Sequence, residues 1–283
     1  MNLLVLGAGG MAGHLVATYL REQGHSVETL SGSHQLDTNT VILDLMDKNA
    51  FEAFLTGKDY DAIINCVGIL VKQSEDRKDL STYLNAFLPH FLEHNYADSK
   101  TKIIHLSTDC VFSGKKPPYK EDDPYDGELF YDRTKALGEL NNSKDLTLRM
   151  SIIGPEIQKN GSGLFHWFMQ QTGQIQGYTG ALWNGVTTLE LAKGIDAALQ
   201  QNITGIYQLV PAGAANISKY ELLKLFKITF SKDDVQIEPK EGVVANKTLL
   251  NTRTDFDFVV PDYPTMINEM HDWVQAHQDL YDY

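Results

Sequence analysis

A short apolar segment, a glycine-rich turn and a helix-length segment follow one another at the start of this 283-residue chain. They are Asn2–Leu6, Gly7–Gly13 and His14–Gln23. A continuous apolar run of this length is typical of a strand buried in a parallel sheet. A glycine turn between such a strand and a helix favours binding of a dinucleotide. The glycines let backbone N–H groups approach the pyrophosphate, and the helix N-terminus adds partial positive charge.

Two glycine spacings can be read in this turn. Gly7, Gly10 and Gly13 make the pattern G-x-x-G-x-x-G, and Gly7, Gly9 and Ala12 make G-x-G-x-x-A. Either spacing, placed directly after a strand, predicts a dinucleotide-binding turn. The residues that we expect to contact a cofactor here are Gly7, Gly10, Met11, Ala12 and Gly13.

The first half of the chain continues to alternate between strand and helix patterns. Further strands are expected at Ser26–Leu30, Val41–Leu43, Ala62–Asn65 and Lys102–Leu106, and helices at Asp47–Leu55, Leu80–Tyr96 and Tyr131–Asn141. This alternation predicts an α/β fold with a doubly wound parallel sheet of the Rossmann type. Ligands bind beyond the carboxyl ends of such strands. Because the glycine turn, Asp44, Asn65–Gly68 and Ser107–Asp109 all follow strands, we expect one crevice to collect them.

The second half of the chain is expected to build most of a smaller lobe. The elements predicted in this half are a helix at Thr187–Gln200, a strand at Gly205–Val210, a helix opened by a capping box of Ser218 and Glu221 and running through Phe230, and a helix at Tyr263–His277. We expect residues 1–153 and about 186–210 to form the NAD(P)-binding domain. Residues from about 154 to 185 and from 211 to 283 would then form a substrate-binding lobe.

Tyr131 and Lys135 are four residues apart in a predicted helix, and Thr108 lies upstream in Ser107-Thr108-Asp109. One helical turn of spacing places the phenol and the amine on the same helix face. An ammonium beside a phenol favours the phenolate, so we expect the pKa of Tyr131 to fall toward neutral pH. The Thr108 hydroxyl could then hold a substrate oxygen while Tyr131 exchanges its proton with it.

The end of the second predicted strand bears on the choice of nicotinamide cofactor. A carboxylate there would bind the ribose hydroxyls of NAD, but Thr29–His34 contains no acidic residue. No arginine lies nearby to hold a 2′-phosphate, although Ser31, Ser33 and His34 could contact one. The segment therefore favours NADP and leaves NAD open. The alternative for His34 is a solvated loop histidine.

Five segments together carry a family resemblance. They are the glycine turn, Asp61–Gly68, Ser107–Gly114 with the pattern S-T-D-x-V-F-x-G, the acidic Pro118–Pro124, and Tyr131–Glu139 with the pattern Y-x-R-x-K-x-x-G-E. In these segments the chain resembles the extended short-chain dehydrogenases/reductases, and within them the dTDP-4-dehydrorhamnose reductase group of nucleotide-sugar reductases. The resemblance covers the first half of the chain firmly, extends through Leu148-Arg149, and weakens beyond it.

The resemblance implies a catalytic triad of Thr108, Tyr131 and Lys135. Tyr131 would protonate the substrate oxygen while the nicotinamide delivers hydride to the adjacent carbon, and Lys135 would lower the tyrosine pKa and bind the nicotinamide ribose. It implies a structural role at a helix bend for Asn85. Further cofactor contacts that it implies are Ser31, Asp44, Leu45, Asn65, Cys66, Val67 and Gly68. Substrate contacts that it implies are Thr108, Cys110, Val111, Tyr131, Trp183 and Asn184.

The implied reaction is NADPH-dependent reduction of the keto group of a nucleotide-activated 6-deoxy-hexulose for surface polysaccharide synthesis. Three departures bear on the substrate. Cys110 replaces a usual tyrosine, Met150–Gly154 replaces a segment that begins Thr-Ser/Ala-Trp, and Asn184–Thr188 replaces G-x-P-T. A sugar on UDP or another nucleotide is therefore as consistent with the sequence as the thymidine form. Tyr178 or Trp183 could stack on the base, or Trp183 could pack within the lobe.

Two alternatives to a reductase stay open at this point. A nucleotide-sugar dehydratase or epimerase shares the fold, and a dehydratase needs an added acid such as Asp109 beside the hydroxyl. A non-catalytic dinucleotide-binding regulatory subunit also shares the fold. The presence of Thr108, Tyr131 and Lys135 together favours the enzyme, because a pure binding protein does not need all three.

The composition of the chain restricts which kinds of partner and ligand it is expected to bind. The net charge of -13 disfavours nucleic acid as a partner. No apolar run reaches the length of a membrane span, and no signal peptide is recognisable, so we expect a cytoplasmic protein with no membrane partner. Cys66 and Cys110 are then expected to be reduced thiols. The histidines show no metal-ligand spacing, so no metal site is expected. The oligomeric state is left open, a homodimer included.

Overall fold

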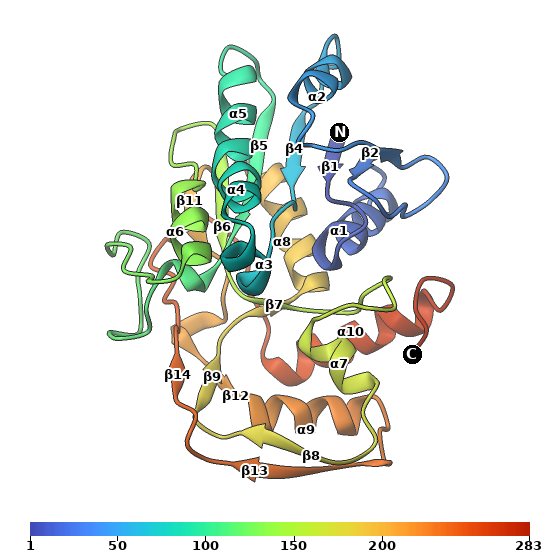
Figure 1. Cartoon of the computed structure of the whole chain (residues 1–283), viewed down its shortest axis with the longest axis vertical. Helices are drawn as coiled ribbons and strands as arrows, with labels where there is room; N and C mark the ends of the chain where they lie inside the picture. Colours follow the sequence, from blue (N-terminus) through green and yellow to red (C-terminus); the bar gives the residue numbers. More distant parts are fainter.

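Seven parallel strands form the central sheet of the computed structural model, which describes residues 1–283 (Figure 1). Their order across the sheet is β11-β6-β5-β4-β1-β2-β3. The strands are β1 (Asn2–Leu6), β2 (Ser26–Ser31), β3 (Val41–Ile42), β4 (Ala62–Asn65), β5 (Lys102–Ser107), β6 (Leu146–Arg149) and β11 (Gly205–Gln208). The order reverses direction between β1 and β4, and this switch point is where doubly wound sheets bind their ligands. The predicted fold class is confirmed.

Helices cover both faces of the sheet because its strands are apolar on both sides. Leu3 and Val5 of β1 join a core with α1 (Met11–Glu22) and α8 (Thr188–Gln200). Leu4 and Leu6 join a second core with α2 (Lys48–Leu55) and α5 (Leu88–Asn95) on the opposite face. This alternation follows from the period of two in a strand. It explains why β1 reads as a continuous hydrophobic run.

The predicted helix at Leu80–Tyr96 is interrupted. The structure has α4 (Lys78–Ser81), a π-turn η1 (Thr82–Phe87) and then α5. Asn85 lies in the π-turn, where its amide accepts from the Ile69 N–H at 3.0 Å and donates to the Ile69 carbonyl at 3.3 Å. The predicted structural role of Asn85 is therefore confirmed. A further helix, α3 (Val71–Asp76), lies in a segment for which no element was predicted.

The helix that carries Tyr131 and Lys135 is α6 (Phe130–Leu137), shorter at its end than predicted. Gly138 follows it and packs against the π-turn. A Cβ at position 138 would lie 2.0 Å from the Asn85 carbonyl oxygen, so only glycine permits this approach. The contact fixes α6 against η1 and hence against the carboxyl ends of β4 and β5.

The remaining elements form a smaller part below the sheet in Figure 1. Its helices are α7 (Leu164–Met169), α9 (Lys219–Thr229) and α10 (Tyr263–Ala276), and the short helices η2 (Asp109–Val111) and η3 (Ala212–Ala214) lie in loops. The additional strands are β7 (Ile152–Ile153), β8 (Gly173–Tyr178), β9 (Ala181–Trp183), β10 (Val186–Thr187), β12 (Ile217–Ser218), β13 (Val235–Lys240) and β14 (Ala245–Asn246). They pair as β10-β7, β12-β9-β14 and β13-β8.

The smaller part shares its hydrophobic core with the sheet. One cluster of 42 buried residues runs from Leu3 in β1 to Trp273 in α10. The capping box predicted for α9 is present, because the Ser218 hydroxyl accepts from the Glu221 N–H and the Glu221 carboxylate accepts from the Ser218 N–H. The division into an NAD(P)-binding domain and a substrate-binding lobe stays a prediction. None of the helices combines the length and the apolar character that crossing a bilayer requires.

Candidate active site

The glycine turn after β1 presents a helix N-terminus without a side-chain cap. Gly7 adopts a φ of +81°, which favours glycine, and a Cβ at Gly13 would lie 2.2 Å from the Gly7 carbonyl oxygen. No acidic residue lies in the first turn of α1. The first N–H groups of a helix have no partner within it, so the N–H groups of Met11, Ala12 and Gly13 are free to bind an anion.

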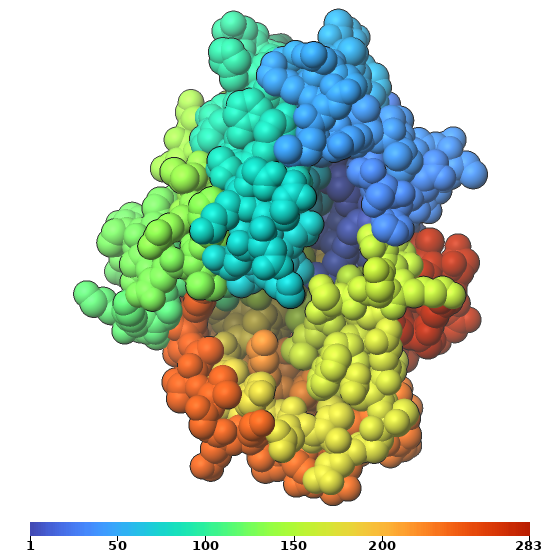
Figure 2. All heavy atoms as spheres, in the orientation of Figure 1, coloured from blue at the N-terminus to red at the C-terminus, as the bar shows by residue number.

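A cavity of about 350 Å³ lies next to this turn, at the carboxyl ends of β4 and β5. Figure 2 shows a hollow between the upper part, which carries the sheet, and the smaller lower part. The predicted residues that line the cavity are Met11, Ala12, Cys66, Val67, Gly68, Thr108, Cys110, Tyr131 and Lys135. Residues from the glycine turn, from the ends of β4 and β5 and from α6 thus meet in one place. Ser107 and Asp109, which were expected in the same crevice, line the cavity as well.

The predicted lowering of the Tyr131 pKa is wrong for this structure. Burial raises the pKa of Tyr131 above its usual value, and the acidic groups of Cys110, Asp109 and Asp132 raise it further, while the Thr108 hydroxyl acts in the opposite direction. Lys135 does not offset these effects. Desolvation of the phenolate is the largest of these effects. Tyr131 keeps its proton at neutral pH, which is the form that a proton donor requires.

Lys135 is buried and points toward β5. Its Nζ donates to the Leu106 carbonyl at 2.6 Å and lies 3.4 Å from Nε2 of His105. Burial lowers the pKa of Lys135 to about 8, and the carboxylate of Glu139 acts in the opposite direction. A substantial fraction of Lys135 is therefore an uncharged amine at mildly alkaline pH.

The Thr108 hydroxyl already has two partners in the loop after β5. It accepts from the Cys110 N–H at 3.1 Å and donates to the Asp109 carboxylate at 3.0 Å. A hydroxyl has one hydrogen, so Thr108 can donate to a substrate oxygen only after that hydrogen leaves Asp109. Burial raises the pKa of the Asp109 carboxyl, which lies in the wall of the cavity next to Thr108.

Two residues predicted to contact the substrate lie behind the cavity wall. Trp183 is buried and its Nε1 donates at 2.8 Å to the Ser151 hydroxyl, which lines the cavity. The Asn184 amide holds the Leu249 backbone through two hydrogen bonds, one of 2.7 Å and one of 3.1 Å. Stacking of Trp183 on a base and a free amide at Asn184 are therefore not what this structure shows.

Other predicted contacts also lie outside this cavity. Val111 is fully buried in a small core with Phe112 and Tyr119. Leu45 is buried in the core under α2, and Asp44 is exposed, with its carboxylate accepting from the Met46 N–H. Direct contacts of Val111 and Leu45 with a ligand would require these side chains to leave a packed core. Asn65 is likewise fully buried and does not line the cavity.

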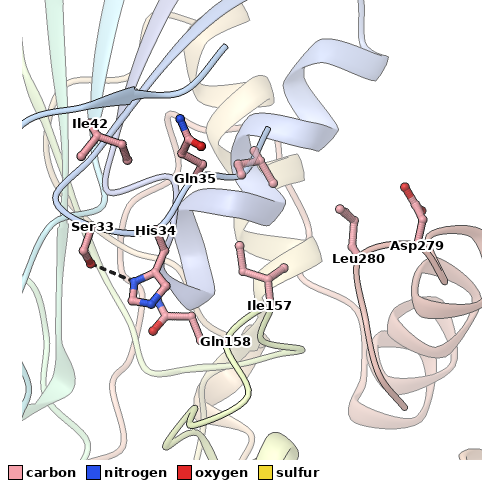
Figure 3. A pocket seen from close by; sticks show the side chains of 9 residues that line it. Ser33, His34, Gln35, Ile42, Ile157, Gln158, Asp279 and Leu280 are labelled. Carbon is pink, nitrogen blue, oxygen red and sulfur yellow. Dashed lines mark hydrogen bonds between the residues drawn. The ribbon is translucent and has the colours of Figure 1, made fainter. Parts of the chain in front are cut away.

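A second cavity, of about 580 Å³, opens where β2 ends. Figure 3 shows His34, Gln158 and Ile157 on one side of the view and Leu280 and Asp279 on the other. Ser33 Oγ and His34 Nδ1 are hydrogen-bonded at 2.8 Å. Ser31 is buried instead, and a Cβ on Gly9 would lie 2.7 Å from its hydroxyl. This cavity adjoins the glycine turn, because Gln158 Nε2 donates to the Gly9 carbonyl at 2.6 Å.

Sequence reasoning missed residues that shape the site, among them Gly163 and Glu75. Gly163 lines the first cavity together with Met150 and Ser151, which directly follow β6 and belong to the segment Met150–Gly154 that the sequence analysis connected with the substrate. Glu75 on α3 accepts from the Phe130 N–H at 2.8 Å and from the Tyr131 N–H at 3.4 Å, so it holds the first turn of α6. Glu75 and Phe130 are 55 positions apart in the chain, so no local sequence pattern predicts this contact.

A buried ion pair between Glu139 and Arg149 lies next to the site. Arg149 on β6 forms two hydrogen bonds with the carboxylate of Glu139, at 3.0 and 2.6 Å. Ser107 and Tyr125 donate to the same carboxylate at 2.5 and 2.8 Å, so all its acceptor positions are used. Ser107 precedes Thr108 and Glu139 lies one turn after Lys135. The pair therefore connects the loop after β5 with the end of α6.

Comparison with known proteins assigns the family. The family model described as the RmlD substrate binding domain matches residues 1–241. The chain belongs to this family. The dTDP-4-dehydrorhamnose reductase of Mycolicibacterium smegmatis is 32% identical over 141 residues, which cover 49% of this chain and 40% of that protein. The methionine adenosyltransferase 2 subunit beta of Xenopus tropicalis is 27% identical over 161 residues, which cover 55% of this chain and 48% of that protein. The chain thus aligns with half or less of these relatives.

The fold is shared with solved structures over nearly the whole chain. The dTDP-4-dehydrorhamnose reductase of Bacillus anthracis, solved in complex with NADP, superposes with a TM-score of 0.80 at 17% identity. The match covers 96% of this chain and 99% of that protein. The RmlD-family chain and this reductase therefore have the same architecture, including the smaller part below the sheet.

Proposed function

We propose that this RmlD-family chain is an NADPH-dependent reductase of a nucleotide-activated keto-sugar. The observation that carries the proposal is the cavity in which Thr108, Tyr131 and Lys135 meet the first turn of α1. A proton donor, a second hydroxyl and an anion-binding helix end are the groups that hydride reduction of a ketone needs around one substrate. The reductase names among relatives and fold neighbours support the same conclusion.

The residues of the glycine turn fit a dinucleotide. The free N–H groups of Met11 to Gly13 would bind its pyrophosphate, and the absence of a carboxylate in the first turn of α1 leaves that charge unopposed. Cys66, Val67 and Gly68 would line the nicotinamide side, and Lys135 would bind its ribose. The bound cofactor supplies hydride.

The cavity at the end of β2 supports NADP over NAD. The side of the cavity next to β2 has no carboxylate to repel a 2′-phosphate, and Ser33 and His34 are placed there as hydrogen-bonding partners. The carboxylate of Asp279 lines the cavity from the opposite side, next to Leu280. The fold neighbour from Bacillus anthracis was solved with NADP. We therefore place the adenosine end of the cofactor beside Ser33, His34 and Gln158.

Tyr131 would act as the acid. Its buried phenol retains its proton until the substrate carbonyl accepts hydride and becomes an alkoxide, which is far more basic than a phenolate. Thr108 would turn its hydrogen from Asp109 to the same oxygen and share the developing charge. Lys135 would stabilise the phenolate that remains after the proton has left.

The substrate that we favour is a 4-keto-6-deoxy-hexose on a nucleoside diphosphate, serving polysaccharide synthesis. A regulatory subunit is the second candidate, because relatives named methionine adenosyltransferase 2 subunit beta align with the same half of the chain. The presence of all three reactive groups in one cavity favours the reductase over that alternative.

The decisive assay follows the loss of NADPH absorbance with a panel of keto-sugar nucleotides that differ in the base and in the sugar. We expect turnover with at least one 4-keto-6-deoxy-hexose. A protein that binds NADPH tightly but reduces none of the panel would support the regulatory alternative.

A further inference from the structure

The side chains of Asn65 and His105 face each other behind the cavity. They are opposite each other in the pairing of β4 with β5, and both are fully buried. Asn65 Oδ1 accepts from the Val67 N–H at 3.1 Å, which fixes the orientation of the amide. Its Nδ2 therefore points at Nδ1 of His105, at 3.1 Å. An amide nitrogen can only donate, so Nδ1 is an acceptor and the ring hydrogen of neutral His105 lies on Nε2.

The Nε2 atom of His105 in turn faces Lys135, with 3.4 Å between Nε2 and Nζ. An ammonium has three donors and no acceptor, so it would meet the Nε2 hydrogen donor to donor. An uncharged amine has a lone pair that can accept that hydrogen. Its two remaining hydrogens then have distinct destinations, the Leu106 carbonyl at 2.6 Å and the cavity that Lys135 lines.

The charged surroundings are compatible with this pattern. Glu139 is the carboxylate that acts on Lys135, and its oxygens are occupied by Arg149, Ser107 and Tyr125. Burial, with a smaller contribution from the charge of His90, keeps the pKa of His105 well below its usual value, so the ring is neutral.

We propose that His105, held in one tautomer by Asn65, is a positioning residue that donates its Nε2 hydrogen to the lone pair of the uncharged form of Lys135. This contact sets the rotation of the amine and directs one N–H of Lys135 into the cavity. The inference deepens the proposed function and rests on it for the role of Lys135. The hydrogen-bond pattern itself can be tested in the protein without cofactor or substrate.

The first measurement is the tautomer of His105 in the unmodified protein. Long-range ¹H–¹⁵N NMR spectra distinguish a ring protonated at Nε2 from one protonated at Nδ1, and the signal of His105 is assigned by its loss in His105→Phe. We expect protonation at Nε2. Asn65→Asp replaces the amide donor by a carboxylate acceptor, so it should move the hydrogen to Nδ1. Protonation at Nδ1 in the unmodified protein would overturn the proposal.

The second measurement is the titration of Lys135, followed through ¹³C-labelled lysine side chains and assigned with Lys135→Met. His105→Phe keeps the ring volume and removes the facing N–H, so the ammonium form should become easier to reach. We expect the titration midpoint to rise by about one pH unit, the size of one hydrogen bond. His90→Phe is the matched control, because His90 acts on His105 by charge and does not touch Lys135.

The two hypotheses fail in different ways. An unchanged Lys135 midpoint in folded His105→Phe would refute the positioning role, whatever the enzyme reduces. A shifted midpoint in a protein that reduces no keto-sugar would refute the proposed function and leave the positioning role standing. With an active substrate, the pH dependence of kcat should shift in His105→Phe in the same direction as the amine, whereas a purely structural role would lower kcat equally at all pH values.

Discussion

At the scale of single residues, burial decides the chemistry of the site more than spacing does. Tyr131 and Lys135 are one turn apart, as a phenol and its activating amine would be, yet burial raises the pKa of Tyr131 and lowers that of Lys135. Desolvation opposes the charged form of each, so both tend toward neutrality. The site is therefore set to donate a proton at neutral pH.

Replacing Tyr131 by Phe removes the donor hydrogen and keeps the ring. We expect kcat with a keto-sugar substrate to fall by about 10²–10⁴-fold, the usual contribution of a general acid. The affinity for NADPH, measured by quenching of protein fluorescence, should stay within a small factor of normal. Near-normal turnover would show that the proton comes from another group, with Thr108 or Asp109 as the first to examine.

Replacing Lys135 by Met should change stability in a pH-dependent way. The folded-state pKa of Lys135 is about 8, below the ordinary value of a lysine, so between these two values the unfolded chain binds more protons than the folded one. The folded protein therefore bears a penalty for the buried charge that is complete below about pH 8 and declines as pH rises. The stability of Lys135→Met relative to the unmodified protein should be greatest near neutral pH and should decrease toward about pH 9.5.

Urea denaturation of both proteins at the two pH values measures this difference. Taking the difference between the proteins cancels other groups that titrate in the same range, such as Lys102. A difference in unfolding free energy that does not vary with pH would mean that the Lys135 amine is not desolvated.

At the scale of elements, the Glu139–Arg149 pair joins α6 to β6 and to the loop after β5. Removing one partner of a buried pair leaves an uncompensated charge, so Arg149→Met should lower the unfolding free energy by about 3–5 kcal/mol. Glu52→Gln is the matched control, because the Lys48–Glu52 pair is exposed and such pairs contribute less than about 1 kcal/mol. If Arg149→Met and Glu52→Gln lowered the unfolding free energy equally in chemical denaturation, the buried Glu139–Arg149 pair would contribute no more to stability than an exposed pair.

Among the elements, the continuous apolar strands could be predicted from the sequence, whereas the shorter or irregular elements could not. The strands at Asn2–Leu6 and Ala62–Asn65 were predicted with the bounds observed, because buried parallel strands are continuous apolar runs. The strands of two or three residues in the smaller part were missed, since segments of that length carry no period. The six-residue strands β8 and β13 were missed as well. The π-turn was also missed, because Thr82–Phe87 has an ordinary helical composition.

The site was predictable only where its residues form a local sequence pattern. The glycine turn and the pair of Tyr131 and Lys135 are local patterns, and the structure brings them together as expected. The contact of Asn65 with His105 depends on the register of two strands that are 40 positions apart. The burial of Trp183 depends on packing against Tyr263, which is 80 positions away.

At the scale of the whole molecule, ligand binding should stabilise both parts together, because one core runs through them. A ligand at 100 times its dissociation constant adds about 2.7 kcal/mol, which corresponds to a rise of about 5 °C in Tm for a chain of this size. We expect NADPH to produce this rise at a lower concentration than NADH in a thermal-shift titration. A stronger response to NADH would overturn the preference for NADP that we infer from the end of β2.

Glu75 has a consequence for how a ligand and the reactive phenol communicate. Its carboxylate on α3 grips the first backbone amides of α6, and the residues just before α3, Ile69 and Leu70, form a wall of the cavity. The cavity wall at Ile69 and Leu70 and the helix α3, which holds α6, are therefore adjacent parts of one continuous segment. A ligand that touches Ile69 or Leu70 would therefore contact the same segment that holds the N-terminus of α6, which carries Tyr131.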